Sequence, residues 1–201
     1  ADALGTENRG MLTTSSTAVA ENLGIQTSVD FVTAGGSVNV AAMQTDINGS
    51  ASAYGVKSLA EAPLSNSGQL FTTADATATS TSVDAAIAIA KEGGVAGGIG
   101  FQSSTVDAVA AGYGMWGASN SVLVQNSDAV TTRAFATADA LSVDVDIQAT
   151  TTGLAFDGAV IDAATTAKAT STGLGGKGDR VKVENNGING FNHGSLFHPL
   201  A

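Results

Sequence analysis

The stretch from Leu70 to Ala90 constrains the fold more than any other part of this sequence. It is an almost unbroken run of small and β-branched residues without Gly or Pro. Side chains alternate between the two faces of a strand. Here the odd-numbered positions from Thr73 to Ile89 hold mainly Thr, Val and Ile, whereas the even-numbered positions hold Ala or Ser apart from Asp84. The alternation predicts one strand far longer than the usual length of about 5–6 residues, with smooth faces that suit sheets stacked on other sheets.

Similar alternation recurs along most of the sequence, with long runs at 131–152 and 154–172. Gly35 and Gly36 separate two shorter alternating stretches, as the turn of a tight hairpin does, and a second turn is expected at Asn48 and Gly49. We therefore expect a mainly β fold in a single domain over residues 1–201. Its form would be an antiparallel β-sandwich or jelly roll with unusually long strands and few or no helices. Shorter strands are predicted at 13–20, 27–34, 37–47, 121–125 and 180–184.

Two segments also fit a helix. Residues 56–62 (VKSLAEA) are the best short helix candidate and are stopped by Pro63. Residues 84–93 fit a helix that begins at Asp84 and ends at Gly93, because Ala favours helices. Ile87 and Ile89 keep the two-residue period of a strand, so we predict that the long strand continues through this segment.

Internal repetition is faint. Residues 71–76 (FTTADA) match residues 135–140 (FATADA) at five of six positions, and both copies open a long alternating run. The tripeptide Ser-Val-Asp also occurs at 28–30, 82–84 and 142–144. No period between about 15 and 50 residues is evident, so a regular solenoid or propeller is not expected.

The composition predicts association between copies of the chain. Charged residues make up 13% and aromatic residues 5% of the sequence, against about 25% charged residues in a typical soluble protein. Ala, Ser and Gly offer little apolar surface to bury, and burial stabilises by roughly 25 cal/mol per Å². We therefore expect a single copy to have a thin core, which packing against other copies would complete.

The net charge of −10 argues against nucleic acid as a partner, because phosphates require clusters of Lys and Arg. No apolar run approaches the roughly 20 residues that a membrane-spanning helix needs. The chain contains no cysteine and begins with Ala-Asp-Ala rather than Met. A mature protein cut by signal peptidase begins in this way, so we expect a secreted, extracellular protein at the cell surface.

Few residues suggest chemistry. Gly112 to Gly117 follow the spacing G-x-G-x-x-G, but the residues after them lack the helical period that a dinucleotide site requires. No nucleophile, base and orienting residue occur together, so neither an enzyme nor a cofactor is expected. Asp144 and Asp146 share one strand face with Gln148. They are candidate ligands for calcium, which binds oxygen atoms, and the alternative is a solvated strand face.

We therefore predict a structural subunit of a self-assembling extracellular filament, tube, sheath or surface layer. It would polymerise non-covalently through β-strands, with copies of itself as partners. The terminal segments 1–23 and 186–201 are the candidates for strand exchange between subunits. The apolar residues expected to mediate assembly are Leu4, Met11, Leu12, Ile188, Phe191, Leu196 and Phe197.

Two alternatives remain. A secreted β-sandwich adhesin or glycan-binding module would use Tyr54, Tyr113 and Trp116 to stack on sugars of cell-surface glycans. An ice-binding protein would use a row of Thr side chains on one strand face. That row consists of Thr73, Thr77, Thr79 and Thr81.

Overall fold

The computed structural model describes residues 5–58, 61–118, 122–177 and 180–187. These residues form ten strands and no helix, and every strand pair is parallel. The expected mainly β fold is confirmed, but the antiparallel sandwich or jelly roll is wrong. The strands are β1 (Thr6–Asn8), β2 (Leu12–Val32), β3 (Gly36–Ser58), β4 (Leu64–Asn66), β5 (Leu70–Ala90), β6 (Val95–Gly117), β7 (Leu123–Asn126), β8 (Val130–Thr150), β9 (Leu154–Gly176) and β10 (Lys182–Asn185).

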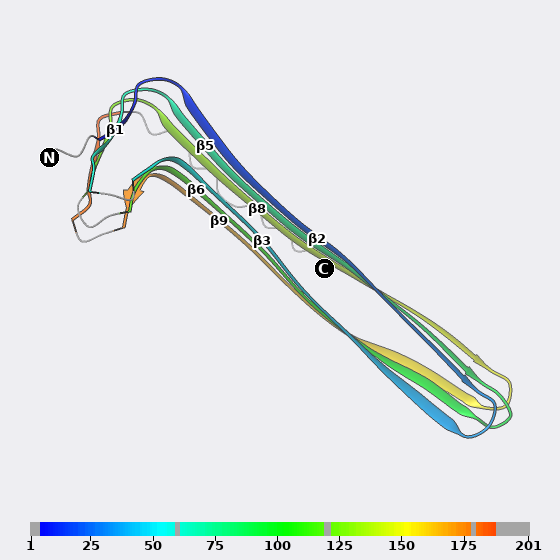
Figure 1. The fold of residues 1–201 in the computed structure, drawn as a ribbon. Coiled ribbons are helices and arrows are strands. Elements are labelled where there is room, and N and C mark those ends of the chain that lie inside the picture. The colour runs from blue at the N-terminus through cyan, green and yellow to red at the C-terminus, as the bar shows by residue number, and fades with distance from the viewer. Residues whose placement is uncertain (1–4, 59–60, 119–121, 178–179, 188–201) are drawn as a thin grey trace.

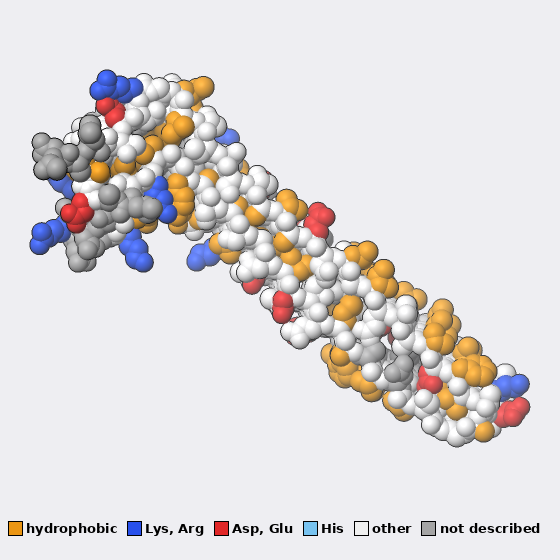
Figure 2. Space-filling view, in the orientation of Figure 1, with side chains coloured by type: hydrophobic (Ala, Val, Ile, Leu, Met, Phe, Trp, Pro, Cys, Tyr) orange, Lys and Arg blue, Asp and Glu red, His pale blue; other side chains and the backbone are white. Residues whose placement is uncertain are grey.

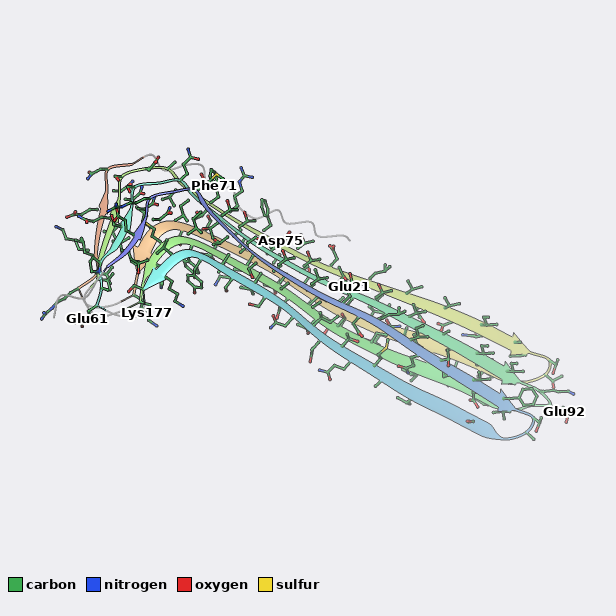
Figure 3. All side chains as sticks on the ribbon, turned by 45° about the horizontal axis from the view of Figure 1, so that its top comes forward. Glu21, Glu61, Phe71, Asp75, Glu92 and Lys177 are labelled. Atoms are coloured by element: carbon green, nitrogen blue, oxygen red, sulfur yellow. The ribbon has the colours of Figure 1, made fainter. Side chains whose placement is uncertain are left out.

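The chain winds as a β-solenoid of three full coils. Each coil has a short strand, a long outgoing strand and a long returning strand, and β10 opens a fourth coil. The three sheets have the orders β1-β4-β7-β10, β2-β5-β8 and β3-β6-β9. Figure 1 shows the two long sheets as one narrow blade that bends where it meets the short sheet, which we call the head. In Figure 3, Glu61 and Lys177 mark the head and Glu92 marks the turns at the far tip.

The predicted hairpin at Gly35 and Gly36 is an arch instead. Gly35 has a φ of 93° and reverses the chain, but β2 and β3 lie in different sheets and face each other through their side chains. Alternation and turn residues predict where strands begin and end, and they do not say which strand is the hydrogen-bonded neighbour. The predicted turn at Asn48 and Gly49 lies within β3, and the helix predicted over 56–62 is wrong because β3 runs to Ser58.

The chain is a regular solenoid, so the expectation that it is not one is also wrong. One coil is longer than the periods of about 15 to 50 residues for which the sequence was considered. The equivalent residues Asn8, Asn66 and Asn126 follow one another at sequence separations of 58 and 60. The FTTADA match joins equivalent strands but is four positions out of register, since Phe71 pairs with Thr131. The tripeptides at 82–84 and 142–144 do pair in register.

Small side chains fill the core of the blade. The even-numbered face of β5 is buried between the sheets, with Ala74, Ala76 and Ala78 inaccessible to solvent. The sheets approach so closely that a Cβ on Gly49 would lie 2.8 Å from the Thr77 carbonyl oxygen. Ala and Gly faces therefore pack against each other within one chain, and the thin core expected of a single copy is closed by this close approach.

Larger apolar residues form a second core under the head. Leu64, Leu70 and Met115 are fully buried there. The blade bends at Gly55 and its neighbour Gly114, where a Cβ on Gly55 would lie 2.6 Å from the Gly114 carbonyl oxygen. Glycine at these positions lets β3 and β6 change the side that faces inward, so that bulkier residues beyond the bend fill a wider space. Among the described residues, no helix is of the length and apolarity required to cross a membrane.

Candidate assembly surfaces

The two ends of the coil stack carry long strand edges. The sheets end with β2 and β3 on one side and with β8 and β9 on the other. These strands have 21 or 23 residues, and each pairs with only one other strand in the described part of the chain. A free strand edge presents a row of backbone N–H and C=O groups, which is a template for pairing with another strand.

Polar side chains face inward in the half of the blade away from the head. Gln26, Asp84 and Asp144 lie at one level on β2, β5 and β8. Asp84 is 2% exposed, and Asp144 is half-buried. The Asp144 Oδ1 atom is buried and has no hydrogen-bond partner within the described structure. The open end of the stack at β8 therefore holds an acceptor that needs a donor.

The two predicted calcium ligands do not converge on each other. Asp144 lies beside Asp84, whereas the Asp146 side chain is exposed further along β8. Within the described ranges, no group of three or more His, Asp or Glu side chains is arranged to hold a metal ion. Calcium at Asp144 stays a prediction.

A ladder of asparagines runs through the head, one from each short strand. The Asn8 amide donates to the Asn66 side-chain oxygen over 2.7 Å, and Asn66 donates to Asn126 over the same distance. Asn126 in turn donates to Asn185 over 2.8 Å. Sequence analysis missed this ladder. Its signal is an Asn followed two positions later by Gly or Asp, which recurs at sequence separations of 58, 60 and 59.

Exposed polar contacts of Glu184 accompany the backbone pairing of the last short strand with β7. Gln125 on β7 donates to the Glu184 carboxylate over 2.8 Å, and Lys182 forms an ion pair with Glu184 on β10 itself. The hydrogen bond from Lys182, and then that from Gln125, lowers the pKa of Glu184 below its ordinary value of 4.5. Protonation of Glu184 in acid would therefore weaken its contacts with Lys182 and Gln125.

The outer surface of the blade carries its larger aliphatic side chains. On β2, β5 and β8, the outward positions from the level of Leu23 to that of Phe31 hold no charged residue. We call this surface the distal apolar face. Leu23, Val29 and Phe31 are each more than 60% exposed. Figure 2 shows hydrophobic side chains gathered on this half of the blade, away from the head. An uncharged apolar surface of this kind is typical of an interaction site. Its large members are Leu23, Ile25, Val29, Phe31, Val83, Ile87, Ile89, Leu141, Val143, Val145 and Ile147.

The three aromatic residues considered for sugar binding lie together at the bend. The Tyr54 and Tyr113 rings stack at 4.8 Å between centroids and 10° between planes, and Trp116 tilts against Tyr113 at 4.7 Å. Lys57 Nζ covers the other face of Tyr54 at 4.2 Å from the ring centroid. The Tyr54 ring is thus engaged within the chain, and glycan binding by these residues stays a prediction. Tyr54 and Tyr113 form a cross-strand aromatic pair, and the G-x-G-x-x-G stretch that contains Tyr113 and Trp116 supplies inward glycines of β6.

The Thr row lies on the outer face of β5 and meets a Thr of an adjacent strand only at Thr77, which pairs with Thr137 on β8. Thr79 pairs with Glu21 on β2 and with Asp139 on β8. An ice-binding surface requires the same row on neighbouring strands, so this geometry does not favour that alternative.

The predicted terminal assembly residues lie partly outside the described residues. Met11 is 75% exposed, and Leu12 packs against the apolar core of the head. The others, Leu4, Ile188, Phe191, Leu196 and Phe197, fall in the ranges that the structure does not describe. No protein-family model, curated protein or solved structure matches the chain, so no relative assigns a function to these surfaces.

Proposed function

We propose that this protein is a self-assembling structural subunit of an extracellular filament, in which copies stack end to end, coil upon coil. In such a filament, β2 and β3 of one copy pair with β8 and β9 of the preceding copy. The observation that carries the proposal is the pair of matching open ends, which leave two long strand edges at each end of the described coils. The extracellular location rests on the sequence alone.

The geometry of the stack determines the form of the polymer. Contacts between one end and the opposite end are heterologous, and because each copy would be added along the stacking axis they generate a filament rather than a closed ring. Neighbouring strands lie about 4.8 Å apart, so three coils would advance a filament by roughly 14 Å per copy. A filament of this kind keeps its strands perpendicular to its axis, as cross-β assemblies do.

When the register between coils is continued across the junction, apolar and hydroxyl side chains of the two ends match, whereas Glu21 of the added copy would lie beside the like-charged Asp139 on the outer face. Thr14 of the added copy would then lie beside Thr132, continuing the column in which Thr14 bonds to Thr72 over 3.3 Å. On the outer face, Leu23 would lie beside Leu141. Apolar columns and hydroxyl columns are thus both preserved.

Gln26 and Asp144 give the junction its specificity. In the same register, the Gln26 amide of the added copy lies beside Asp144, whose Oδ1 atom is buried without a partner in the described structure. An amide donor there would satisfy this acceptor. Hydrogen bonds to charged groups contribute about 1.5–3 kcal/mol, which corresponds to a change in critical concentration of roughly ten- to a hundred-fold.

The test compares filament formation by substituted chains in sedimentation and negative-stain microscopy. We expect Gln26→Glu to raise the critical concentration at least tenfold, because two carboxylates would then meet at the junction. Asn22→Asp is the matched control, since it makes the same change on the same strand but would lie beside Ala140. The double variant with Asp144→Asn should restore assembly.

Folding is checked separately by thermal unfolding of each variant at low concentration, because Glu at position 26 also lies beside Asp84. A wild-type chain that stays monomeric at millimolar concentration would overturn the proposal. So would a folded Gln26→Glu variant that assembles like the control.

A further inference from the structure

The head sheet has one strand more than the long sheets. It contains β1, β4, β7 and β10, whereas each long sheet contains three strands. If an added copy places its β2 on β8 and its β3 on β9, its β1 arrives at the level that β10 already occupies on β7. Two strands cannot pair with the same edge of β7, so one of them must leave.

The sequence of β10 resembles that of β1 more than it resembles the other two short strands. Residues 7–10 read Glu-Asn-Arg-Gly, and residues 184–187 read Glu-Asn-Asn-Gly. The equivalent of the Glu is Ser65 in β4 and Gln125 in β7. In both end strands the Glu forms an ion pair with a basic residue two positions away, Arg9 in one case and Lys182 in the other.

The asparagine ladder gives β10 the same hydrogen-bonding role as β1. Each Asn donates its amide to the Asn of the next coil, and Asn8 donates to Asn66 in this way. Asn185 accepts from Asn126, so the direction of the ladder leaves the Asn185 amide to donate to the next level. In an added copy, the acceptor at that level is Asn66.

We propose that β10 of one copy replaces β1 of the following copy and pairs there with β4. This strand exchange rests on the end-to-end assembly proposed above and specifies how the two heads join. The displaced strand is easily released, because β1 pairs over only three residues, Thr6 to Asn8, and its side chains are largely exposed. The exchange keeps one short strand per coil and one unbroken asparagine ladder along the filament.

Cysteine pairs report the exchange directly, since the chain has no cysteine of its own. Glu184 occupies the position of Glu7, which pairs with Ser65. The pair Glu184→Cys and Ser65→Cys should therefore form disulfides between copies when filaments form. Within one chain these residues lie two strands apart, about 10 Å, which is too far for a disulfide.

The matched pair Glu7→Cys and Ser65→Cys reports the strand that leaves. It should form a disulfide within the unassembled chain, and assembly under reducing conditions followed by oxidation should yield little of it. The outcomes are read on denaturing gels as a ladder of linked chains against a monomer band. The expected result is a ladder from the Glu184 pair in the filament and none at dilutions where no filament forms.

The two proposals fail in different ways. Filaments whose Glu184 pair remains unlinked while the Glu7 pair links within the chain would overturn the exchange and leave end-to-end assembly standing. Absence of filaments from the wild-type chain would overturn both.

Discussion

Replacing Asn66 by Leu breaks the asparagine ladder at its middle. Asn66 is fully buried, accepts from Asn8 and donates to Asn126, each over 2.7 Å. Leu has the same number of side-chain heavy atoms as Asn and is bulkier, so the substitution removes two hydrogen bonds without opening a cavity. It leaves the Asn8 amide and the Asn126 oxygen with poorer partners, a 3.5 Å contact to the Gln69 carbonyl and a 3.4 Å contact from the Asp128 amide.

The cost follows from these lost bonds. A net hydrogen bond contributes about 0.5–1.5 kcal/mol, and a buried group left unpaired costs about 1–3 kcal/mol. We therefore expect Asn66→Leu to lower the free energy of unfolding by about 2–4 kcal/mol. For a chain of this length the melting temperature should fall by roughly 5–12 °C.

Thermal and denaturant unfolding, followed by circular dichroism below the assembly concentration, would measure this change. Asn8→Leu is the control. Asn8 lies at the end of the ladder and is half-buried, and its replacement removes only the one ladder bond, to Asn66. Its cost should be about 1 kcal/mol. Equal costs at the two positions, or a cost below about 0.5 kcal/mol at Asn66, would refute the ladder as a source of stability.

Three further predictions address other parts of the molecule. Gly49→Ala should destabilise the chain by about 1–3 kcal/mol in the same assay, because its Cβ meets the backbone of Thr77, whereas Gly158→Ala has open space and should be neutral. We expect the distal apolar face to join filaments side by side, so Val145→Glu should reduce bundling of filaments in micrographs and leave the melting temperature nearly unchanged. The Glu184 pKa is lowered in the folded chain, so its contribution is present above about pH 4.5 and is lost as the pH falls through the folded pKa; protease cleavage within residues 182–187 should therefore increase at pH 3 relative to pH 6.

Alternation along the sequence predicted β5, β8 and β9 as long strands, whereas β2 was predicted as two shorter strands, β3 only as far as residue 47, and β6 not at all. The predicted run from Leu70 to Ala90 coincides with β5, and the run at 131–152 lies within two positions of β8 at either end. The strand interpretation of Ile87 and Ile89 is also confirmed. These predictions succeed because the two-residue period is a local property of an extended chain with one face buried.

Strand partners were not predictable by the same means. The neighbour of each strand lies one full coil away along the chain, and paired outward side chains differ between coils, as at Glu21, Thr79 and Asp139. Most inward positions hold Ala, Ser or Gly, which recur by chance in this composition. The asparagines of the head, the glycines of the bend and the tripeptides at 82–84 and 142–144 do repeat in register, and a search for repeats as long as one coil could have found them.

The expectation of an incomplete core failed for a physical reason that also bears on assembly. Counting side-chain bulk ignores that Ala and Gly faces let two sheets approach until their backbones nearly touch, as at Gly49 and Thr77. The chain then has small residues inside and Val83, Ile87 and Ile89 outside, so its stability depends more on contacts between coils than on buried bulk.

In a solenoid, stability is approximately the sum of the coils and of the interfaces between neighbouring coils. Three coils have two such interfaces within the chain, and end-to-end stacking gives every copy one more. Assembly would therefore raise the number of coil interfaces per chain by about half. Because the long strands pair along almost their whole length within the chain, the same pairing that holds one coil on the next supplies the driving force for polymerisation between chains.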